Sequence, residues 1–112
     1  MLDECVPRPL ALALRERGQD ATAFPNAWKQ LPDGALITRA VAAGYAALIT
    51  GDKSMPFQQS VAGQPLAVLV LPTTHVKPVL ALADRIANVL ERIPEGAFSV
   101  LTETGFASPI GQ

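Results

Sequence analysis

The sequence predicts an α/β domain: a three-layer, Rossmann-like sandwich in which a parallel sheet of about four to five strands is flanked by helices. Short apolar runs alternate with segments of helical periodicity along most of the chain. This alternation is typical of parallel strands joined by right-handed helical crossovers. The strand-like runs are also continuously apolar, as expected for a sheet that helices cover on both faces.

The composition agrees with one folded domain. The chain has 112 residues, of which 49% are hydrophobic and 17% charged, which supports a packed core and excludes a disordered protein. The net charge of −1 argues against binding nucleic acid through a strong overall positive field. The net charge does not exclude an enzyme that acts on a phosphodiester at one local site.

The sequence also gives an expectation for the compartment. The single cysteine, Cys5, excludes an internal disulfide, and we expect its side chain to be small, apolar and buried. No leader-like segment opens the chain, and its apolar runs are far shorter than the roughly 20 residues that span a membrane. We therefore expect a cytoplasmic protein with no membrane partner.

In the first half of the chain, a short apolar start is followed by a helix over residues 7–18, with two prolines at its front and Gly18 at its end. Residues 21–24 predict a weak strand, and residues 25–32 a loop bounded by prolines. Asp33 stands at the N-cap position of a second helix, which Gly44 closes.

The second half holds the strongest strand signals. Three strands are predicted from apolar runs, at residues 45–50, 65–71 and 96–101. Residues 55–61 predict a short helix, and residues 77–93 show the clearest helical periodicity, with a face that could serve a homodimer as well as the core. We predict one domain over residues 1–101 and a loose tail over residues 102–112.

Carboxylates follow two of the apolar runs. Asp3 and Glu4 come directly after the first run, Asp52 follows the strand 45–50, and Asp33 opens a helix. The carboxyl ends of parallel strands meet at one edge of a sheet, where ligands bind near the point of strand-order reversal. Carboxylates that converge there stay ionised together only if a cation joins them, and Mg²⁺ or Mn²⁺ suits such oxygen ligands. The pattern therefore favours a metal site able to activate a water against a phosphodiester.

Several motifs point to one family in the same order along the chain. They are "LDECVPRPLALALRERGQD", "W-x-x-L-x-D-G-x-L", "LIT-x-DK" and "FQQ", followed by the apolar run "AVLVL". Over residues 2–75 this arrangement resembles a small bacterial PIN-like domain of the toxin-type ribonuclease class. The resemblance implies a PIN fold and hydrolysis of RNA with Mg²⁺ or Mn²⁺. It also implies control by a small antitoxin protein, as in toxin–antitoxin pairs.

The resemblance also assigns roles to residues. Asp3, Asp33 and Asp52 would be catalytic and would hold the metal, and Glu4 would assist them. The expected substrate contacts are Lys53, Arg8, Gln58 and Gln59.

Ordinary structural roles compete with these assignments. Asp33 is a common helix cap, and one residue can both cap and bind metal. Asp52 and Lys53 together also suit a plain turn, while Lys53 and Arg8 are by default surface charges. Glu4 fits a surface position better than a metal ligand.

Two features favour an alternative function. Only Met1 and Leu2 precede Asp3, and the full acidic quartet of active PIN nucleases is not plain in the sequence. The alternative is a catalytically degenerate PIN-like module that binds an antitoxin or a second copy of itself. A third possible function is that of a phospho-acceptor domain of receiver type. Such a domain places a lysine directly after a late strand, whereas Lys77 of this chain follows a loop.

Overall fold

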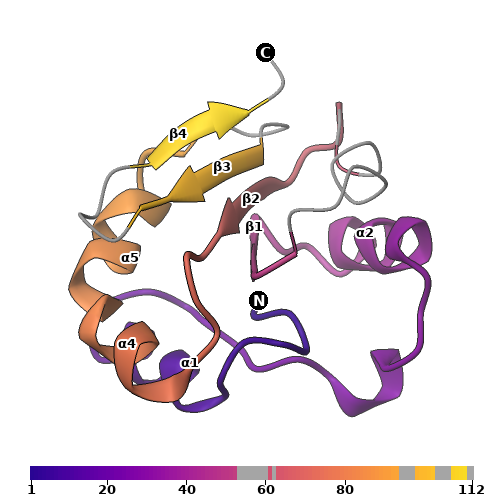
Figure 1. The fold of residues 1–112 in the computed structure, drawn as a ribbon. Helices are drawn as coiled ribbons and strands as arrows, with labels where there is room; N and C mark the ends of the chain where they lie inside the picture. The colour runs from indigo at the N-terminus through magenta and orange to yellow at the C-terminus, as the bar shows by residue number, and fades with distance from the viewer. Residues whose placement is uncertain (53–60, 62, 94–97, 103–106, 111–112) are drawn as a thin grey trace.

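The fold is built on a four-stranded sheet (Figure 1). The computed structural model describes residues 1–52, 61, 63–93, 98–102 and 107–110, with backbone alone for Asp33 and for 107–110. The strands, in both chain and spatial order, are β1 (Ala47–Thr50), β2 (Ala67–Val70), β3 (Phe98–Leu101) and β4 (Ala107–Ile110). The first three are parallel and β4 is antiparallel to β3. The α/β class is confirmed, but among the described residues the parallel part of the sheet has three strands, fewer than the four to five predicted.

The N-terminal segment extends the sheet beyond β1 without forming a full strand. Leu2 makes a single parallel bridge to Ile49. The amide of Asp3 donates to the carbonyl of Ile49 at 2.7 Å, and the amide of Ile49 donates to the carbonyl of Met1 at 2.9 Å. On its other side, the amide of Leu2 donates to the carbonyl of Thr22 at 2.9 Å. The start of the chain is thus held between residues 21–24 and β1.

Strand residues alternate between two apolar layers. Ile49 and Leu69 belong to one buried cluster, while Leu48 and Val68 belong to the other. The first layer is covered by α1 (Pro9–Arg15), α4 (Val76–Ala81) and α5 (Ala83–Leu90), and the second by α2 (Asp33–Ala42). Helices therefore cover both faces of the sheet, which explains the uninterrupted apolar runs (Figure 1).

Several boundaries differ from the sequence-based expectations. The helix predicted over residues 77–93 is two helices, because Leu82 leaves the helical conformation with φ −93° and ψ 2°. The apolar spacing continues across this break, so periodicity alone could not reveal it. The tail predicted from residue 102 contains β4, in which Pro109 is tolerated because this strand lies at the edge of the described sheet.

The first half of the chain shows smaller differences. Residues 21–24 are extended but form no strand, and the loop over residues 25–32 contains a 3-10 helix, η1 (Asn26–Trp28). The N-cap of α2 is Pro32, one residue before the predicted cap. Apart from Val61, the helix predicted at residues 55–61 lies outside the described residues. No helix in the described part of the chain has the length and apolarity to cross a membrane.

The α-amino group of Met1 is buried in this arrangement. Met1 is 6% exposed, and its amino group donates to the carbonyl of Ala47 at 2.9 Å. Burial lowers the pKa of this amine from 8.0 to about 6, against a smaller raising effect of the Asp20 carboxylate. The charged amine is therefore less favourable in the folded chain than in the unfolded one.

This burial predicts a pH dependence of stability. Between pH 6 and pH 8 the unfolded chain binds more protons at Met1 than the folded chain does. The free energy of unfolding should consequently rise with pH across this window, by about 2 kcal/mol in total. Urea unfolding at pH 5.5, 6.5, 7.5 and 8.5 measures the effect.

The control is His75→Gln, which removes the only histidine of the chain from an exposed position. This variant should keep the slope, because the amine of Met1 produces it. A slope that disappears with His75 would contradict the assignment to Met1.

Candidate functional site

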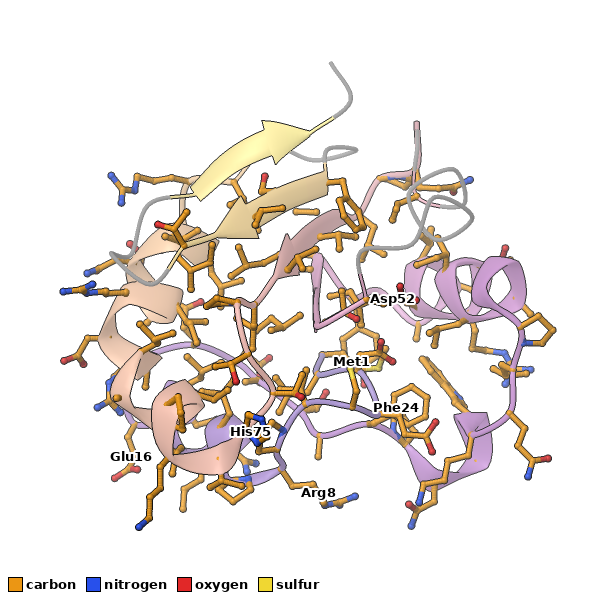
Figure 2. The ribbon with its side chains drawn as sticks, viewed as in Figure 1. Met1, Arg8, Glu16, Phe24, Asp52 and His75 are labelled. Atoms are coloured by element: carbon orange, nitrogen blue, oxygen red, sulfur yellow. The ribbon has the colours of Figure 1, made fainter. Side chains whose placement is uncertain are left out.

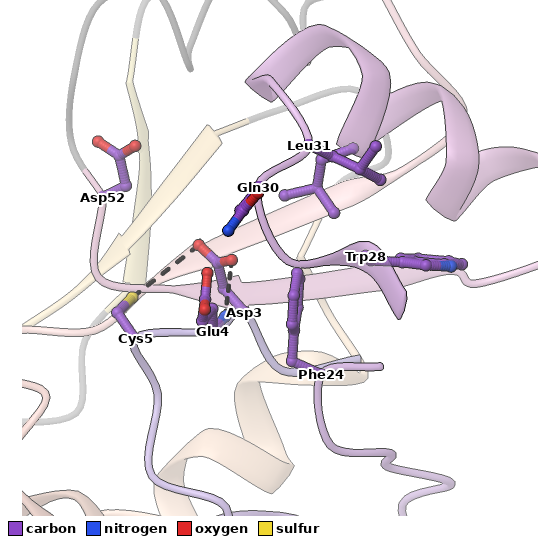
Figure 3. Close-up of a pocket in the computed structure, with 9 residues that line it drawn as sticks. Asp3, Glu4, Cys5, Phe24, Trp28, Gln30, Leu31 and Asp52 are labelled. Atoms are coloured by element: carbon purple, nitrogen blue, oxygen red, sulfur yellow. Dashed lines mark hydrogen bonds between the residues drawn. The ribbon is translucent and has the colours of Figure 1, made fainter. Parts of the chain in front are cut away.

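An open hollow of about 430 Å³ lies at the carboxyl ends of the N-terminal segment and β1 (Figure 3). Three carboxylates line it, those of Asp3, Glu4 and Asp52. The rest of the lining consists of Cys5, Phe24, Trp28, Gln30, Leu31 and Leu36. Figure 3 shows these side chains grouped around the hollow, with the carboxylate of Asp3 near its centre.

The hollow forms where the chain changes direction across the sheet. The N-terminal segment continues into α1, which covers one face of the sheet. The chain then returns to residues 21–24, which lie beside residues 1–3 on the side away from β1. After β1 the chain passes through Val61, which packs into the cluster on the opposite face, and continues to β2. Connections that leave neighbouring strands toward opposite faces open a crevice between them, which is where α/β sheets bind ligands. The sequence-based placement of Asp3 and Asp52 at one edge is therefore confirmed.

A buried hydroxyl joins the two aspartates. Thr50 is 0% exposed, and its Oγ1 donates to Oδ2 of Asp3 at 2.6 Å. The same oxygen accepts the backbone amide of Asp52 at 3.0 Å. Thr50 thus fixes the carboxylate of Asp3 and the backbone that carries Asp52. This role was not predicted from the sequence, although Thr50 is the only polar residue in the run Ala47–Thr50.

Cys5 lies at the rim of the hollow. Its thiol is exposed, so the expectation of a buried Cys5 is wrong. The chain turns directly after Asp3, where the amide of Val6 donates to the carbonyl of Asp3 at 3.0 Å. As a result Val6 enters the core, while Cys5 faces the sheet edge, where its Sγ accepts the amide of Gly51 at 3.4 Å.

Aromatic packing supports the opposite wall. The ring of Trp28 meets Tyr45 edge-on, with centroids 6.1 Å apart at 86°, and the guanidinium carbon of Arg39 lies 5.9 Å from the Trp28 centroid. Both contacts anchor the loop that carries Trp28 against the rest of the domain. The same loop holds Gln30 at a φ of 73°, a conformation that residues other than glycine seldom adopt.

The other residues predicted to belong to the site lie outside the hollow or outside the described part of the chain. Asp33 begins α2 between Leu31 and Leu36, which both line the hollow, but its own side chain lies outside the described part. Arg8 is exposed before α1 and is not among the residues that line the hollow, so its role as a substrate contact stays a prediction. Its position follows from the turn after Asp3. The other predicted contacts, Lys53, Gln58 and Gln59, lie outside the described residues.

The donor set suits a metal ion that retains much of its hydration. Oδ1 of Asp3 accepts the amide of Glu4 at 2.8 Å, while Oδ2 accepts the hydroxyl of Thr50 at 2.6 Å and the thiol of Cys5 at 3.9 Å, which leaves a lone pair on Oδ1. Within the described residues, no three acidic, histidine or cysteine side chains are grouped tightly enough to hold a metal ion. Mg²⁺ commonly binds through one or two carboxylates and several waters. The described residues fit that type of site better than a closed protein cage.

Comparisons with family models, with curated proteins and with solved structures find no match to this chain.

Gly51 separates this hollow from the next loop. A Cβ atom built on Gly51 would lie 2.5 Å from Cγ2 of Thr74 and 3.6 Å from Sγ of Cys5. The first distance is too short for a real contact, whereas the second is ordinary. An alanine at this position would therefore force the side chain of Thr74 to move.

The role of Thr50 can be tested with two substitutions. Thr50→Val keeps the shape but removes the hydroxyl, so it should lower the free energy of unfolding by about 1–3 kcal/mol. It should also speed hydrogen exchange of the Asp52 amide, which loses its acceptor. Thr50→Ser retains the hydroxyl and should leave that exchange slow. If the Asp52 amide exchanges equally fast in both variants, the bridging role is wrong.

The close approach at Gly51 predicts a paired effect. Gly51→Ala should cost about 1–3 kcal/mol of stability through overpacking against Thr74. Thr74→Ser removes the offending methyl and keeps the hydroxyl, so the double variant should regain most of the loss. A double-mutant cycle by chemical unfolding measures this coupling, and additive losses would contradict it.

Proposed function

We propose that the chain is a Mg²⁺- or Mn²⁺-dependent ribonuclease of PIN-like type that hydrolyses RNA phosphodiesters at the acidic hollow. The observation that carries this proposal is that Asp3, Glu4 and Asp52 all line one open hollow at the carboxyl edge of the sheet. An edge of this kind is where α/β sheets bind ligands, and its carboxylates suit a hard divalent cation. The PIN-like motifs of the sequence support the same assignment.

In this proposal each residue has a separate task. Asp3 and Asp52 would hold the cation, with Asp33 as a third ligand, and Glu4 would orient or deprotonate a water. A bound Mg²⁺ or Mn²⁺ would lower the pKa of a water and polarise the phosphodiester. Thr50 keeps the Asp3 carboxylate in one orientation, so less ordering is needed when the cation binds.

The aromatic side of the hollow supports a nucleic-acid substrate. Trp28 lines the hollow that the carboxylates share and is partly exposed, whereas Phe24, which is 7% exposed, belongs to the apolar core behind it. Aromatic faces stack on unpaired bases with little sequence preference. A single-stranded segment could therefore place a base against this wall and its phosphate toward the acids.

Metal binding is the direct test. Addition of Mn²⁺ at about 100 times its Kd should raise the Tm of the wild-type chain by roughly 10 °C, since only the folded state presents the site. Asp3→Asn and Asp52→Asn should lose this rise, and RNA cleavage should fall at least about 100-fold. Thermal unfolding and cleavage of a labelled single-stranded RNA provide the two measurements.

Glu16→Gln is the matched control, because Glu16 is an exposed carboxylate at the end of α1, remote from Asp52 in Figure 2. It should retain both the Tm rise and cleavage. Cleavage by Asp52→Asn at the wild-type rate would rule out the site. A Tm rise shared equally by all variants would mean that Mn²⁺ binds elsewhere.

The second candidate is a catalytically degenerate PIN-like module that binds an antitoxin or another copy of the chain. Three exposed aliphatic side chains favour it: Leu12 on α1, and Val76 and Leu80 on α4. Scattered apolar exposure of this extent is normal on protein surfaces, so it ranks second. This candidate would be favoured if Mn²⁺ left the Tm of the chain unchanged and the chain did not cleave RNA.

A further inference from the structure

A second hollow, of about 420 Å³, adjoins the acidic one at the carboxyl ends of β1 and β2. Its lining consists of Gly51, Leu71, Pro72, Thr73, Thr74 and His75. Gly51 carries the boundary between the two hollows, because its neighbours Cys5 and Asp52 line the first and Gly51 itself lines the second. We propose that this second hollow binds the phosphate next to the one being cleaved in a single-stranded RNA. The inference rests on the proposed ribonuclease function.

Gly51 brings the linings of the two hollows close together. Its Cβ position lies 2.5 Å from Cγ2 of Thr74, which lines the second hollow, and 3.6 Å from Sγ of Cys5, which lines the acidic one. Side chains from the two linings therefore approach each other at Gly51, which places the second hollow directly beside the acidic one.

The charge of the second hollow differs from that of the first. Three carboxylates line the acidic hollow, whereas none of the six residues that line the second is acidic. A neighbouring phosphate would be repelled by the carboxylates unless a cation screened them, but it meets no carboxylate among the lining residues of the second hollow. The second hollow is therefore the better place for an additional phosphate.

Hydrogen-bond donors are available there. The backbone amide of His75 donates to Oγ1 of Thr73 at 3.2 Å, so this oxygen already acts as an acceptor and its hydroxyl proton is free to point outward. Thr74 carries a second hydroxyl, and the exposed imidazole of His75 offers an N–H in either tautomer. Hydroxyl and imidazole donors are common partners of phosphate oxygens.

Substrates that differ by one phosphate test the proposal. A dinucleoside monophosphate can fill only the acidic hollow, whereas a trinucleoside diphosphate can reach both. The wild-type chain, used with Ca²⁺ in place of Mg²⁺ so that cleavage does not interfere, should bind the longer molecule about tenfold tighter by fluorescence anisotropy. Adding Thr73→Val or His75→Gln should bring this ratio close to one without changing binding of the shorter molecule.

Thr38→Val serves as the control, because Thr38 is an exposed threonine on α2 whose hydroxyl donates to the carbonyl of Gly34. It should leave the tenfold ratio intact. His75→Gln covers the case in which Thr73→Val disturbs the local turn, because His75 is exposed.

The outcomes separate this inference from the function on which it rests. Equal affinity for both molecules, or an equal loss for both in the variants, would overturn the second phosphate site and leave the ribonuclease proposal standing. Binding of neither molecule would overturn both claims about RNA. The Mn²⁺-dependent rise in Tm would then still report whether the acidic hollow holds a metal.

Discussion

The candidate site depends on the pairing of three N-terminal residues with β1. Two amide–carbonyl bonds between Met1–Asp3 and Ile49 set the register, and this register brings the carboxylate of Asp3 to the hydroxyl of Thr50. A shift of one residue would turn Leu2 out of the core and carry Asp3 away from Thr50. The buried side chains of Met1 and Leu2, which enter opposite apolar layers, oppose such a shift. Core packing thus positions a polar site that contributes little apolar burial of its own.

The same pairing links stability to the neighbourhood of the site. Seating Met1 inside the domain disfavours its charged amine, as the lowered pKa shows. The hydrogen bond to Ala47 and the Asp20 carboxylate recover part of that cost. Strain at Gln30 and the close approach at Gly51 lie at the rim of the same two hollows. Such local costs are tolerated where the surrounding packing is strong, and they tend to accumulate at functional sites.

The sequence predicted what depends on apolar patterning. The α/β class, the positions of β1, β2 and β3, and the shared edge of Asp3 and Asp52 follow from runs that must be buried on both faces, whereas the number of parallel strands was overestimated. Features that depend on a single backbone angle were missed, such as the break at Leu82, because the apolar period continues through it. The exposure of Cys5 was not predicted, because the turn after Asp3 directs Val6 into the core and leaves Cys5 at the surface. The role of Thr50 needs a partner 47 residues away, which no local pattern encodes.

The arrangement of segments does not by itself select a function. Residues 21–24, residues 1–3 and then β1, β2 and β3 lie side by side in an order found in flavodoxin-like domains, which include phospho-acceptor proteins. The chemistry at the strand ends has to decide. β3 is followed by Thr102 and then, in the sequence, by Glu103, so the lysine of a phospho-acceptor site has no counterpart there. The described strand ends instead carry one hollow lined by carboxylates and aromatic residues. Beyond Gly51 they carry a second hollow that no acidic residue lines. A cation-assisted reaction on an extended polyanion uses all three features, whereas transfer of a single phosphoryl group to Asp52 would use only the first.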